Sequence, residues 1–428
     1  MTQRRFSKFV AAGAGALLAV ATLTGPAGAR TADVTTTSRA GGLDRQALRE
    51  SLDAVHEAGL YGIYSEVRDQ DQTWRGASGV ADVDTNRPVR PDMVHRVGSI
   101  SKTFAAVAIL QQVARGTVEL DAPIGRYLPD LVPGERGQQV TVRMLLNHTS
   151  HLGDYVGPAF PSLLEGSTRS LDDERLRDIA PEELVKLGLA AAPTGQPGAT
   201  PGSYSNTNYV LIGLLLEKVT GTDAEQYITR NVIRKAGLRH TSFPRTPHIP
   251  GPHSKAYESW YGLIDPPRDY SVYNMSWAYT AGAVTSTMDD LNRFYRALLG
   301  GRLIEPAQLA EMQKTVPVLA GGGAMAYGLG LYSLDLPCGR FWGHDGAVFG
   351  MTTLSLSTPD GKRQLSLGMN LTKYQRVDEN GQIEPSPIDA ALNRYALVAA
   401  CGPGDARTKA AQPALTLFPS DGMRGLAR

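Results

Sequence analysis

Cysteine and clustered histidine are scarce in this sequence. Its 428 residues include only two cysteines, Cys338 and Cys401, and eight histidines, none of them paired as H-x-x-x-H. Zinc sites need three or four such ligands close together, so we expect no metal. An excess of one charge is also lacking, because 43 Lys and Arg stand against 42 Asp and Glu, without a basic block. That balance argues against nucleic acid as a partner.

Long apolar runs are absent beyond the N-terminus. Arg4, Arg5 and Lys8 precede an apolar stretch at 10–23, and small residues follow at 27–29. This order predicts a secretory signal peptide over residues 1–29 and a flexible leader over 30–43. We therefore expect a secreted protein with no stable membrane span after cleavage. A retained anchor is the alternative, and the Arg pair leaves the twin-arginine route open.

Export bears on the two cysteines. In an exported chain an isolated cysteine pair is typical of a disulfide, so we expect Cys338 to be bonded to Cys401. Neither lies near the signal cleavage site, which excludes a lipid-anchored form.

The apolar periodicity predicts an α+β protein. Helices are expected at 43–59, 99–115, 209–219 and 289–299, and strands at 61–68, 73–80, 351–357 and 363–370. The helix at 99–115 is apolar on all sides from Phe104 to Leu110, which is typical of a buried helix. Strands at both ends predict an antiparallel sheet, flanked by helices and built from both termini, with an inserted, mostly helical lobe. The expected boundaries are 44–98 with 300–402 for the sheet lobe, 99–299 for the helical lobe, and 403–428 for a mobile tail.

Ser99 and Lys102 form an S-x-x-K motif at the start of a helix. Residues three apart share one helix face, so the amine can reach the hydroxyl. A serine is a weak nucleophile until a base takes its proton, and burial lowers the pKa of a lysine toward that role. The alternative is a helix-capping serine followed by a solvated lysine, because short motifs also occur by chance.

Two further motifs lie later in the chain. Tyr204 and Asn206 stand in a loop rich in Pro and Gly before an apolar helix, where a phenol can shuttle protons and an amide can hold a carbonyl. His344, Asp345 and Gly346 lie on a late strand, where a glycine lets a substrate backbone lie along the edge. A helix-capping turn and an ordinary strand end are the respective alternatives.

Together, these motifs resemble the active site of the serine β-lactamase and penicillin-binding protein superfamily, in its branch with Y-x-N and H-x-G motifs. Supporting stretches are 97–98, 141–150 and 280–287. The resemblance spans about 44–402 and is greatest to secreted D-alanyl-D-alanine carboxypeptidases of actinomycetes. Cys338 and Cys401 fall where that branch has its disulfide.

The resemblance implies a role for each site residue. Ser99 would form the acyl-enzyme, and Lys102 with Tyr204 would move protons. Asn206 would orient the acyl part of the substrate, and His344 would add positive potential and poise Tyr204. Trp277 would form a wall of the cleft. The N–H groups of Ser99 and Ala347 would form the oxyanion hole. No cofactor is implied. We expect a monomer that acts on peptidoglycan stem peptides or other D-peptides and is acylated by β-lactams.

The sequence departs from the carboxypeptidase pattern where that branch holds a substrate carboxylate. The Arg position falls on Tyr332, and the two Thr positions fall on Asp345 and Ala347. We expect Asp345 and Ala347 to face one groove, where an Asp would repel a carboxylate unless a nearby Arg pairs with it. The leading prediction is a D-alanyl-D-alanine carboxypeptidase. The alternatives are a D-aminopeptidase, amidase or esterase, then a class C-like β-lactamase or a non-catalytic penicillin-binding protein.

Overall fold

The computed structural model describes residues 42–321, 323–380, 382–404 and 417–419. The expected signal peptide at 1–29 and most of the expected leader at 30–43 lie outside these residues. Leu43 is buried against the body of the protein, so the leader is shorter than the sequence indicates. Within the described ranges, no helix is long and apolar enough to cross a membrane.

A ten-stranded sheet runs through the described part of the chain, in the order β3-β2-β1-β14-β13-β12-β11-β10-β9-β5. Neighbouring strands are antiparallel, except for the short pair of β5 and β9. The strands of this sheet are β1 (Gly62–Asp69), β2 (Gln72–Asp82), β3 (Arg87–Pro88), β5 (Gly202–Ser203), β9 (Val316–Ala320), β10 (Gly323–Tyr327), β11 (Tyr332–Leu336), β12 (Gly339–Val348), β13 (Met351–Ser357) and β14 (Arg363–Met369). The pairing of β1 with β14 confirms a sheet built from both ends of the chain.

The smaller strands form two further sheets. They are β4 (His95–Arg96) with β8 (Thr285–Ser286), and β6 (Tyr257–Glu258) between β7 (Arg268–Asp269) and β15 (Leu371–Thr372). The pairing of β4 with β8 matters for the site, because β4 leads directly into the segment that carries Ser99.

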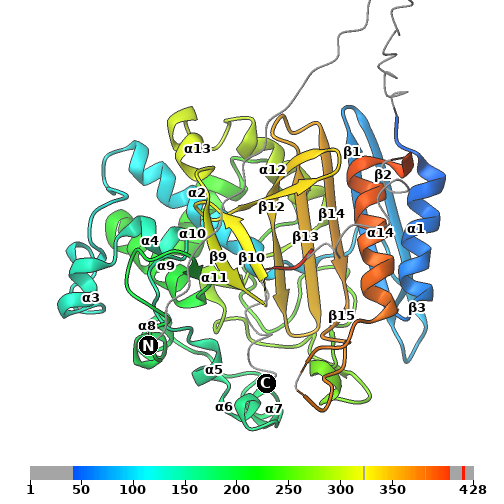
Figure 1. Cartoon of the computed structure of the whole chain (residues 1–428), viewed down its shortest axis with the longest axis horizontal. Helices are drawn as coiled ribbons and strands as arrows, with labels where there is room; N and C mark the ends of the chain where they lie inside the picture. The colour runs from blue at the N-terminus through cyan, green and yellow to red at the C-terminus, as the bar shows by residue number, and fades with distance from the viewer. Residues whose placement is uncertain (1–41, 322, 381, 405–416, 420–428) are drawn as a thin grey trace, which may run out of the picture. The chain divides into compact units, whose positions relative to one another are not determined.

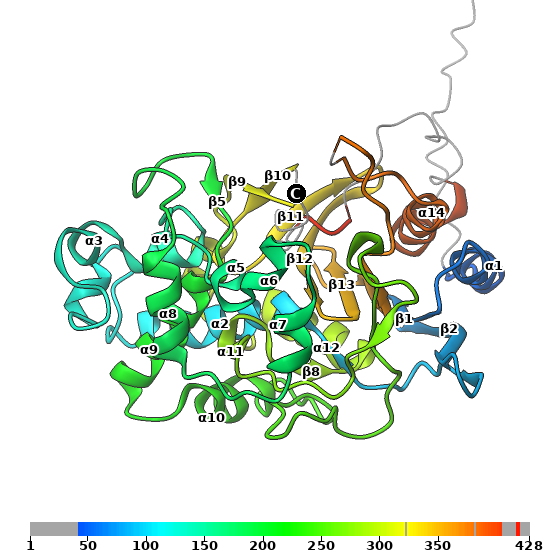
Figure 2. The same cartoon turned by 90° about the horizontal axis from the view of Figure 1, so that it is seen from below.

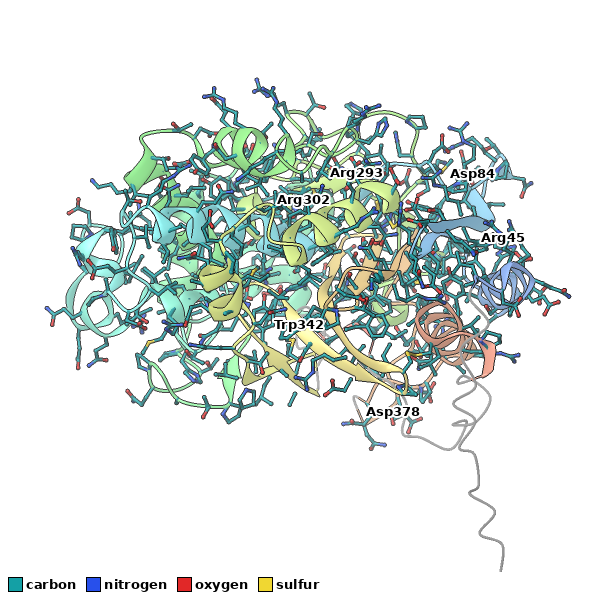
Figure 3. The ribbon with its side chains drawn as sticks, turned by 90° about the horizontal axis from the view of Figure 1, so that it is seen from above. Arg45, Asp84, Arg293, Arg302, Trp342 and Asp378 are labelled. Atoms are coloured by element: carbon teal, nitrogen blue, oxygen red, sulfur yellow. A yellow bond between two sulfur atoms is a disulfide. The ribbon has the colours of Figure 1, made fainter. Side chains whose placement is uncertain are left out.

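Helices cover both faces of the large sheet. The terminal helices α1 (Arg45–Glu57) and α14 (Pro387–Cys401) pack against each other on one face, and α12 (Met288–Leu299) lies on β1, β13 and β14 on the other (Figures 1 and 2). Charged side chains such as Arg45 and Asp84 lie on the outside, whereas Trp342 of β12 lies inside (Figure 3).

The helical lobe is built around α2 (Ser101–Ala114) and α9 (Asn206–Thr220), which contact each other. Residues 104–110 of α2 are fully buried, which confirms the expectation from their apolar pattern. The lobe's other helices are α3 (Gly134–Gln139), α4 (Val142–Leu146), α5 (Val156–Ala159), α6 (Pro161–Leu164), α7 (Arg169–Asp173), α8 (Pro181–Ala190), α10 (Ala224–Ile228) and α11 (Tyr279–Gly282), while α13 (Pro306–Met312) follows later in the chain. Single turns occur at η1 (Gly98–Ile100), η2 (Ile124–Arg126), η3 (Thr229–Ile233) and η4 (Trp260–Gly262).

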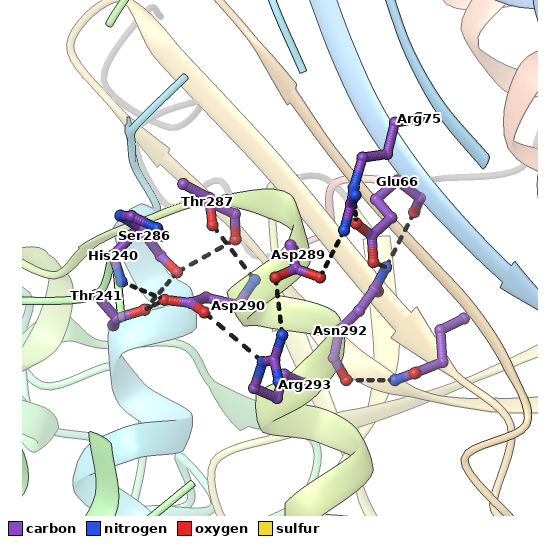
Figure 4. A network of polar contacts seen from close by, with 11 residues as sticks. Glu66, Arg75, His240, Thr241, Ser286, Thr287, Asp289, Asp290, Asn292 and Arg293 are labelled. Carbon is purple, nitrogen blue, oxygen red and sulfur yellow. Dashed lines mark hydrogen bonds and ion pairs between the residues drawn. The ribbon is translucent and has the colours of Figure 1, made fainter. Parts of the chain in front are cut away.

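Polar contacts hold α12 to the sheet (Figure 4). Arg75 of β2 pairs with Glu66 of β1 at 2.7 Å and with Asp289 at 3.0 Å, and Asn292 donates to the Glu66 carbonyl at 3.1 Å. Asp290 accepts from Thr241 at 2.9 Å, which ties the same helix to a loop of the helical lobe. The sequence division places α12 in the helical lobe, but the helix packs on β1, β13 and β14 of the sheet.

The two cysteines form the expected disulfide, which joins the turn between β11 and β12 to the end of α14. The expected mobile tail is wrong for the three residues described at 417–419. Leu417 is buried in the apolar cluster between the sheet and the terminal helices, because its side chain finds an apolar surface there. The remainder of the expected tail, apart from residues 403 and 404, lies outside the described residues.

We predict that the Cys338→Ala/Cys401→Ala variant is less stable by about 4 kcal/mol, because the bridge closes a loop of this length in the unfolded chain. Its sequence separation is 63 residues. Urea unfolding of the oxidised protein and the variant measures this difference. Ester hydrolysis is expected to stay the same, because the bridge lies away from Ser99. Equal unfolding midpoints would contradict the prediction.

Candidate active site

Ser99 lies in a single 3-10 turn, η1, directly before α2, rather than at the first position of the helix that the sequence predicts at 99–115. The turn follows Gly98, whose φ of +54° disfavours a side chain. Helix α2 continues directly from the turn, so Lys102 still lies on the same side as Ser99. The Lys102 Nζ atom is 3.0 Å from the Ser99 Oγ atom. The two side chains that the S-x-x-K motif predicts to meet are in hydrogen-bond contact.

Lys102 is fully buried, so the alternative of a solvated lysine is wrong. Its Nζ atom also donates to the Asn206 Oδ1 at 2.7 Å and to the Ala281 carbonyl at 2.9 Å. Burial lowers the pKa of Lys102 to about 7, while the carboxyl groups of Asp154 and Asp345 oppose that shift. A neutral amine is therefore accessible near pH 7, which is what a general base requires.

The three acceptors around Lys102 define what happens when it loses a proton. A charged ammonium has three N–H donors and can satisfy Ser99, Asn206 and Ala281 at once. A neutral amine has two donors and one lone pair. The Asn206 Oδ1 and the Ala281 carbonyl can only accept, so the lone pair is left for the Ser99 hydroxyl. The arrangement can thus take the proton from Ser99.

Tyr204 lies between β5 and α9, and its ring lies close to the amine of Lys102. The centre of the ring is 4.9 Å from the Lys102 Nζ. His148 packs against the other rings here, with its centroid 4.1 Å from that of Tyr204. Tyr204 is buried and held in place by these rings. Its role in proton transfer stays a prediction.

Asn206 lies between Lys102 and Asp154 and contacts both. Its Nδ2 donates to the Asp154 Oδ2 at 2.8 Å, while its Oδ1 accepts from Lys102. One of the two Nδ2 hydrogens is therefore taken by Asp154, and the expected contact of the amide with a substrate carbonyl stays a prediction. Asp154 itself was missed by the sequence analysis, although it follows closely on the supporting stretch at 141–150. No spacing rule connects it to Asn206, 52 residues later.

The resemblance implied that His344 adds positive potential to the site, but the structure does not support this role. Burial lowers the pKa of His344 to about 3, with a further contribution from the charge of Lys102. Its Nδ1 donates to the Asp345 carbonyl at 2.5 Å, and its Nε2 pairs with the Tyr327 hydroxyl at 2.9 Å. Although the Asp345 Oδ1 lies 3.9 Å from the His344 Nδ1, burial outweighs this contact and favours the neutral imidazole, so His344 holds neighbouring groups in place rather than supplying charge.

Gly346 allows a close approach between two backbones. A Cβ atom at this position would lie 2.1 Å from the Val97 carbonyl and 2.6 Å from the Ser99 nitrogen. A Cβ at Gly98 would lie 2.7 Å from the Ala347 nitrogen. The glycine therefore serves the contact of β12 with the nucleophile turn, and the backbone nitrogens of Ser99 and Ala347 lie at that contact, as an oxyanion hole requires.

The edge of β12 at 344–348 is paired with β13 only. Its partner on the other side, β11, ends opposite Gly343. Asp345 is fully buried, whereas Ala347 is partly exposed, and the expectation that both face one groove stays a prediction. Burial and the nearby Asp345 raise the pKa of Tyr332 well above its usual range. The expected Arg position thus holds a buried phenol beside a carboxyl group.

Trp277 borders the segment that follows Ala347. Its ring packs on Phe349 with centroids 4.9 Å apart, and Phe160 packs edge-on against both. Tyr155 donates to the Trp277 carbonyl at 2.6 Å. This position is compatible with the expected cleft wall, whose contact with substrate stays a prediction.

The fold and the Ser99–Lys102 pair define a serine hydrolase of the β-lactamase and penicillin-binding protein fold. Residues 45–378 match the family described as beta-lactamase, to which this chain belongs.

Three similar proteins represent the comparisons. A D-stereospecific amidohydrolase from a Streptomyces species is 35% identical with a TM-score of 0.72, covering 84% of this chain and 99% of that one. The D-amino acid amidase of Ochrobactrum anthropi SV3, complexed with L-phenylalanine amide, is 26% identical with a TM-score of 0.65, covering 76% and 91%. A penicillin-binding protein of Bacillus subtilis (strain 168) is 27% identical over 334 residues, which are 75% of this chain and 70% of that protein.

We predict that the hydrolysis of p-nitrophenyl acetate rises with pH through about 7, because Lys102 must lose its proton to act as base. At pH 5 the kcat/KM is expected to be about 100-fold below its plateau. The Lys102→Arg variant stays protonated and is expected to lose about 1000-fold. Lys186→Arg, at an exposed position on α8, is the matched control. A flat profile between pH 5 and 8 would contradict this role.

We also predict that Gly346→Ala lowers kcat about 100-fold, because the added carbon displaces β12 and the Ala347 nitrogen from the nucleophile turn. Gly323→Ala on β10 is the control, since a Cβ there contacts nothing within 4 Å. Stopped-flow measurement of acylation and thermal unfolding of both variants separate catalysis from folding. A Gly346→Ala enzyme with parental kcat would refute the argument.

Proposed function

We propose that this chain is a D-stereospecific amidohydrolase, which cleaves amides and short peptides of D-amino acids through an acyl-enzyme on Ser99. The observation that carries the proposal is the charge around the catalytic pair. Two carboxyl groups, Asp154 and Asp345, act on Lys102, while the histidines at 148 and 344 are held neutral by burial.

The chemistry follows from the site. Neutral Lys102 takes the proton of Ser99, and the Oγ attacks the substrate carbonyl. The N–H groups of Ser99 and Ala347 stabilise the resulting oxyanion. Tyr204 gives its proton to the leaving amine and takes up the proton held by Lys102, the C–N bond breaks, and the acyl group stays on Ser99 as an ester. Attack by water then releases the acid and restores the hydroxyl.

Charge favours an amide or amine substrate over one with a free carboxylate. Two like charges about 6 Å apart repel by about 3 kcal/mol at an effective dielectric constant of 20. A carboxylate beside Asp345 would meet this repulsion, and Tyr332 supplies no cation to offset it. A protonated α-amine would be attracted instead.

The similar proteins agree with this choice. Two of them are named as a D-stereospecific amidohydrolase and a D-amino acid amidase. The D-alanyl-D-alanine carboxypeptidase reading, which led from the sequence, has less support than these alternatives. Esterase activity would use the same steps, because the alcohol of an ester leaves more easily than the amine of an amide.

We further propose that the protein acts outside the cell as a monomer, on D-peptides such as those of peptidoglycan stems. The support for export is the pattern at residues 1–29. β-Lactams are expected to acylate Ser99, since they present a strained amide to the same nucleophile.

The test is a comparison of two substrates that differ only in charge. A D-Ala-D-Ala peptide and its C-terminal amide are hydrolysed side by side, and the amide is expected to have a kcat/KM at least about 10-fold higher, in line with the repulsion above. D- and L-amino acid amides test stereospecificity in the same assay. A strong preference for the free acid would overturn the proposal.

Variants assign the reaction to the site. Ser99→Ala is expected to abolish hydrolysis and labelling by a fluorescent penicillin while leaving thermal unfolding unchanged. Asp345→Asn is expected to narrow the preference for the amide. Rapid turnover of a cephalosporin would favour a β-lactamase instead, and labelling without turnover of any substrate would favour a penicillin-binding protein.

A further inference from the structure

Asp154 links two segments of the site through one carboxyl group. It lies between α4 and α5, and its Oδ2 accepts both from the Asn206 backbone N–H and from the Asn206 Nδ2, each at 2.8 Å. Its Oδ1 accepts from the Val156 N–H at 2.8 Å. All three partners are N–H donors, so the site is built for a carboxylate rather than for an amide.

These contacts fix which end of the Asn206 amide faces Lys102. A carboxylate can only accept, so the nitrogen end of Asn206 must point toward Asp154. The oxygen end is then left for Lys102, at 2.7 Å. Without Asp154, either the oxygen end or the nitrogen end of the Asn206 amide could face Lys102.

The orientation of Asn206 decides the direction of the lysine lone pair. When the Asn206 oxygen faces a neutral Lys102, the amine must donate to it and to the Ala281 carbonyl. Its lone pair then points at Ser99, 3.0 Å away. If the amide were reversed, the Asn206 Nδ2 would donate to that lone pair and block the base.

We propose that Asp154 is a positioning residue for catalysis, which locks Asn206 so that the neutral Lys102 directs its lone pair at Ser99. This rests on the acylation chemistry of the proposed function and not on its substrate class. Asp154 touches neither Ser99 nor the reacting carbonyl in this scheme, and it acts through Asn206.

The same carboxyl group also acts on the lysine through charge. The titratable groups around Lys102 are Asp154 and Asp345, which raise its pKa, and His148 and His344, whose own pKa values are lowered. The rings of Tyr204 and Tyr209 also face its amine. Removal of the charge at 154 therefore lowers the pKa of Lys102 and moves the acidic limb of the rate profile to lower pH. A helix-capping role alone would leave that limb in place.

The experiment measures kcat/KM for p-nitrophenyl acetate against pH, because this neutral ester does not titrate. Asp154→Asn is expected to lose about 10-fold or more at the plateau, as for other misplaced catalytic groups, and to shift the acidic limb downward. Asp223→Asn is the matched control. Asp223 caps α10 in the same lobe through the Gln226 N–H at 2.8 Å, and the variant is expected to keep the parental profile.

A second variant exchanges the two side chains, Asp154→Asn/Asn206→Asp. The amide at 154 can then donate to the carboxylate at 206, which accepts from Lys102 and holds the amine in place. We expect at least a threefold recovery over Asp154→Asn, with the acidic limb above that of the parent, because a negative charge now contacts Lys102. Since the exchange restores the pair, it also provides the test if Asp154→Asn alone does not fold.

The outcomes are distinct. The positioning role would be overturned if Asp154→Asn kept the parental plateau and the parental acidic limb of kcat/KM. It would also be overturned if the exchanged variant recovered no activity and its acidic limb did not move. If the parent protein is not acylated at Ser99, as judged by mass spectrometry, the proposed function fails instead. Thermal unfolding of each variant identifies losses that come from folding alone.

Discussion

The burial of one amine governs the rest of this site. Burying Lys102 at the start of α2 favours its neutral form, and the cost of burial is offset by three fixed hydrogen-bond acceptors. Burial alone would lower its pKa further, and the carboxyl groups of Asp154 and Asp345 limit that shift to about 7. The balance between burial and nearby charge leaves an amine that can hold or release a proton near neutrality.

The acceptors around Lys102 come from segments far apart in the chain. Ser99 precedes the lysine, Asn206 begins α9, and Ala281 lies in α11. The strand β12 closes the site from the sheet side, because Gly346 and Gly98 let it touch the nucleophile turn. Catalysis therefore depends on the packing of the helical lobe against the sheet, and each element has to keep its position for the amine to keep its partners.

Much of the fold was predictable from local patterns. The helix at 43–59, the hairpin at 61–80 and the hairpin at 351–370 follow from apolar periodicity and turn residues, and the structure has them within a few residues. The division of lobes was less accurate, since α12 reads as part of the helical region but binds the sheet through Arg75, Glu66 and Asn292. Periodicity identifies a buried face without identifying the partner that covers it.

The sequence by itself determined the contact between Ser99 and Lys102, because residues three apart at the start of a helix lie within one turn of each other. The tertiary structure decided the orientation of Asn206, the neutrality of His344, the burial of Asp345 and the presence of Asp154. Each of these depends on desolvation or on a hydrogen bond between distant residues. Spacing along a chain fixes what lies one turn away, whereas burial and charge depend on everything that folds around the group.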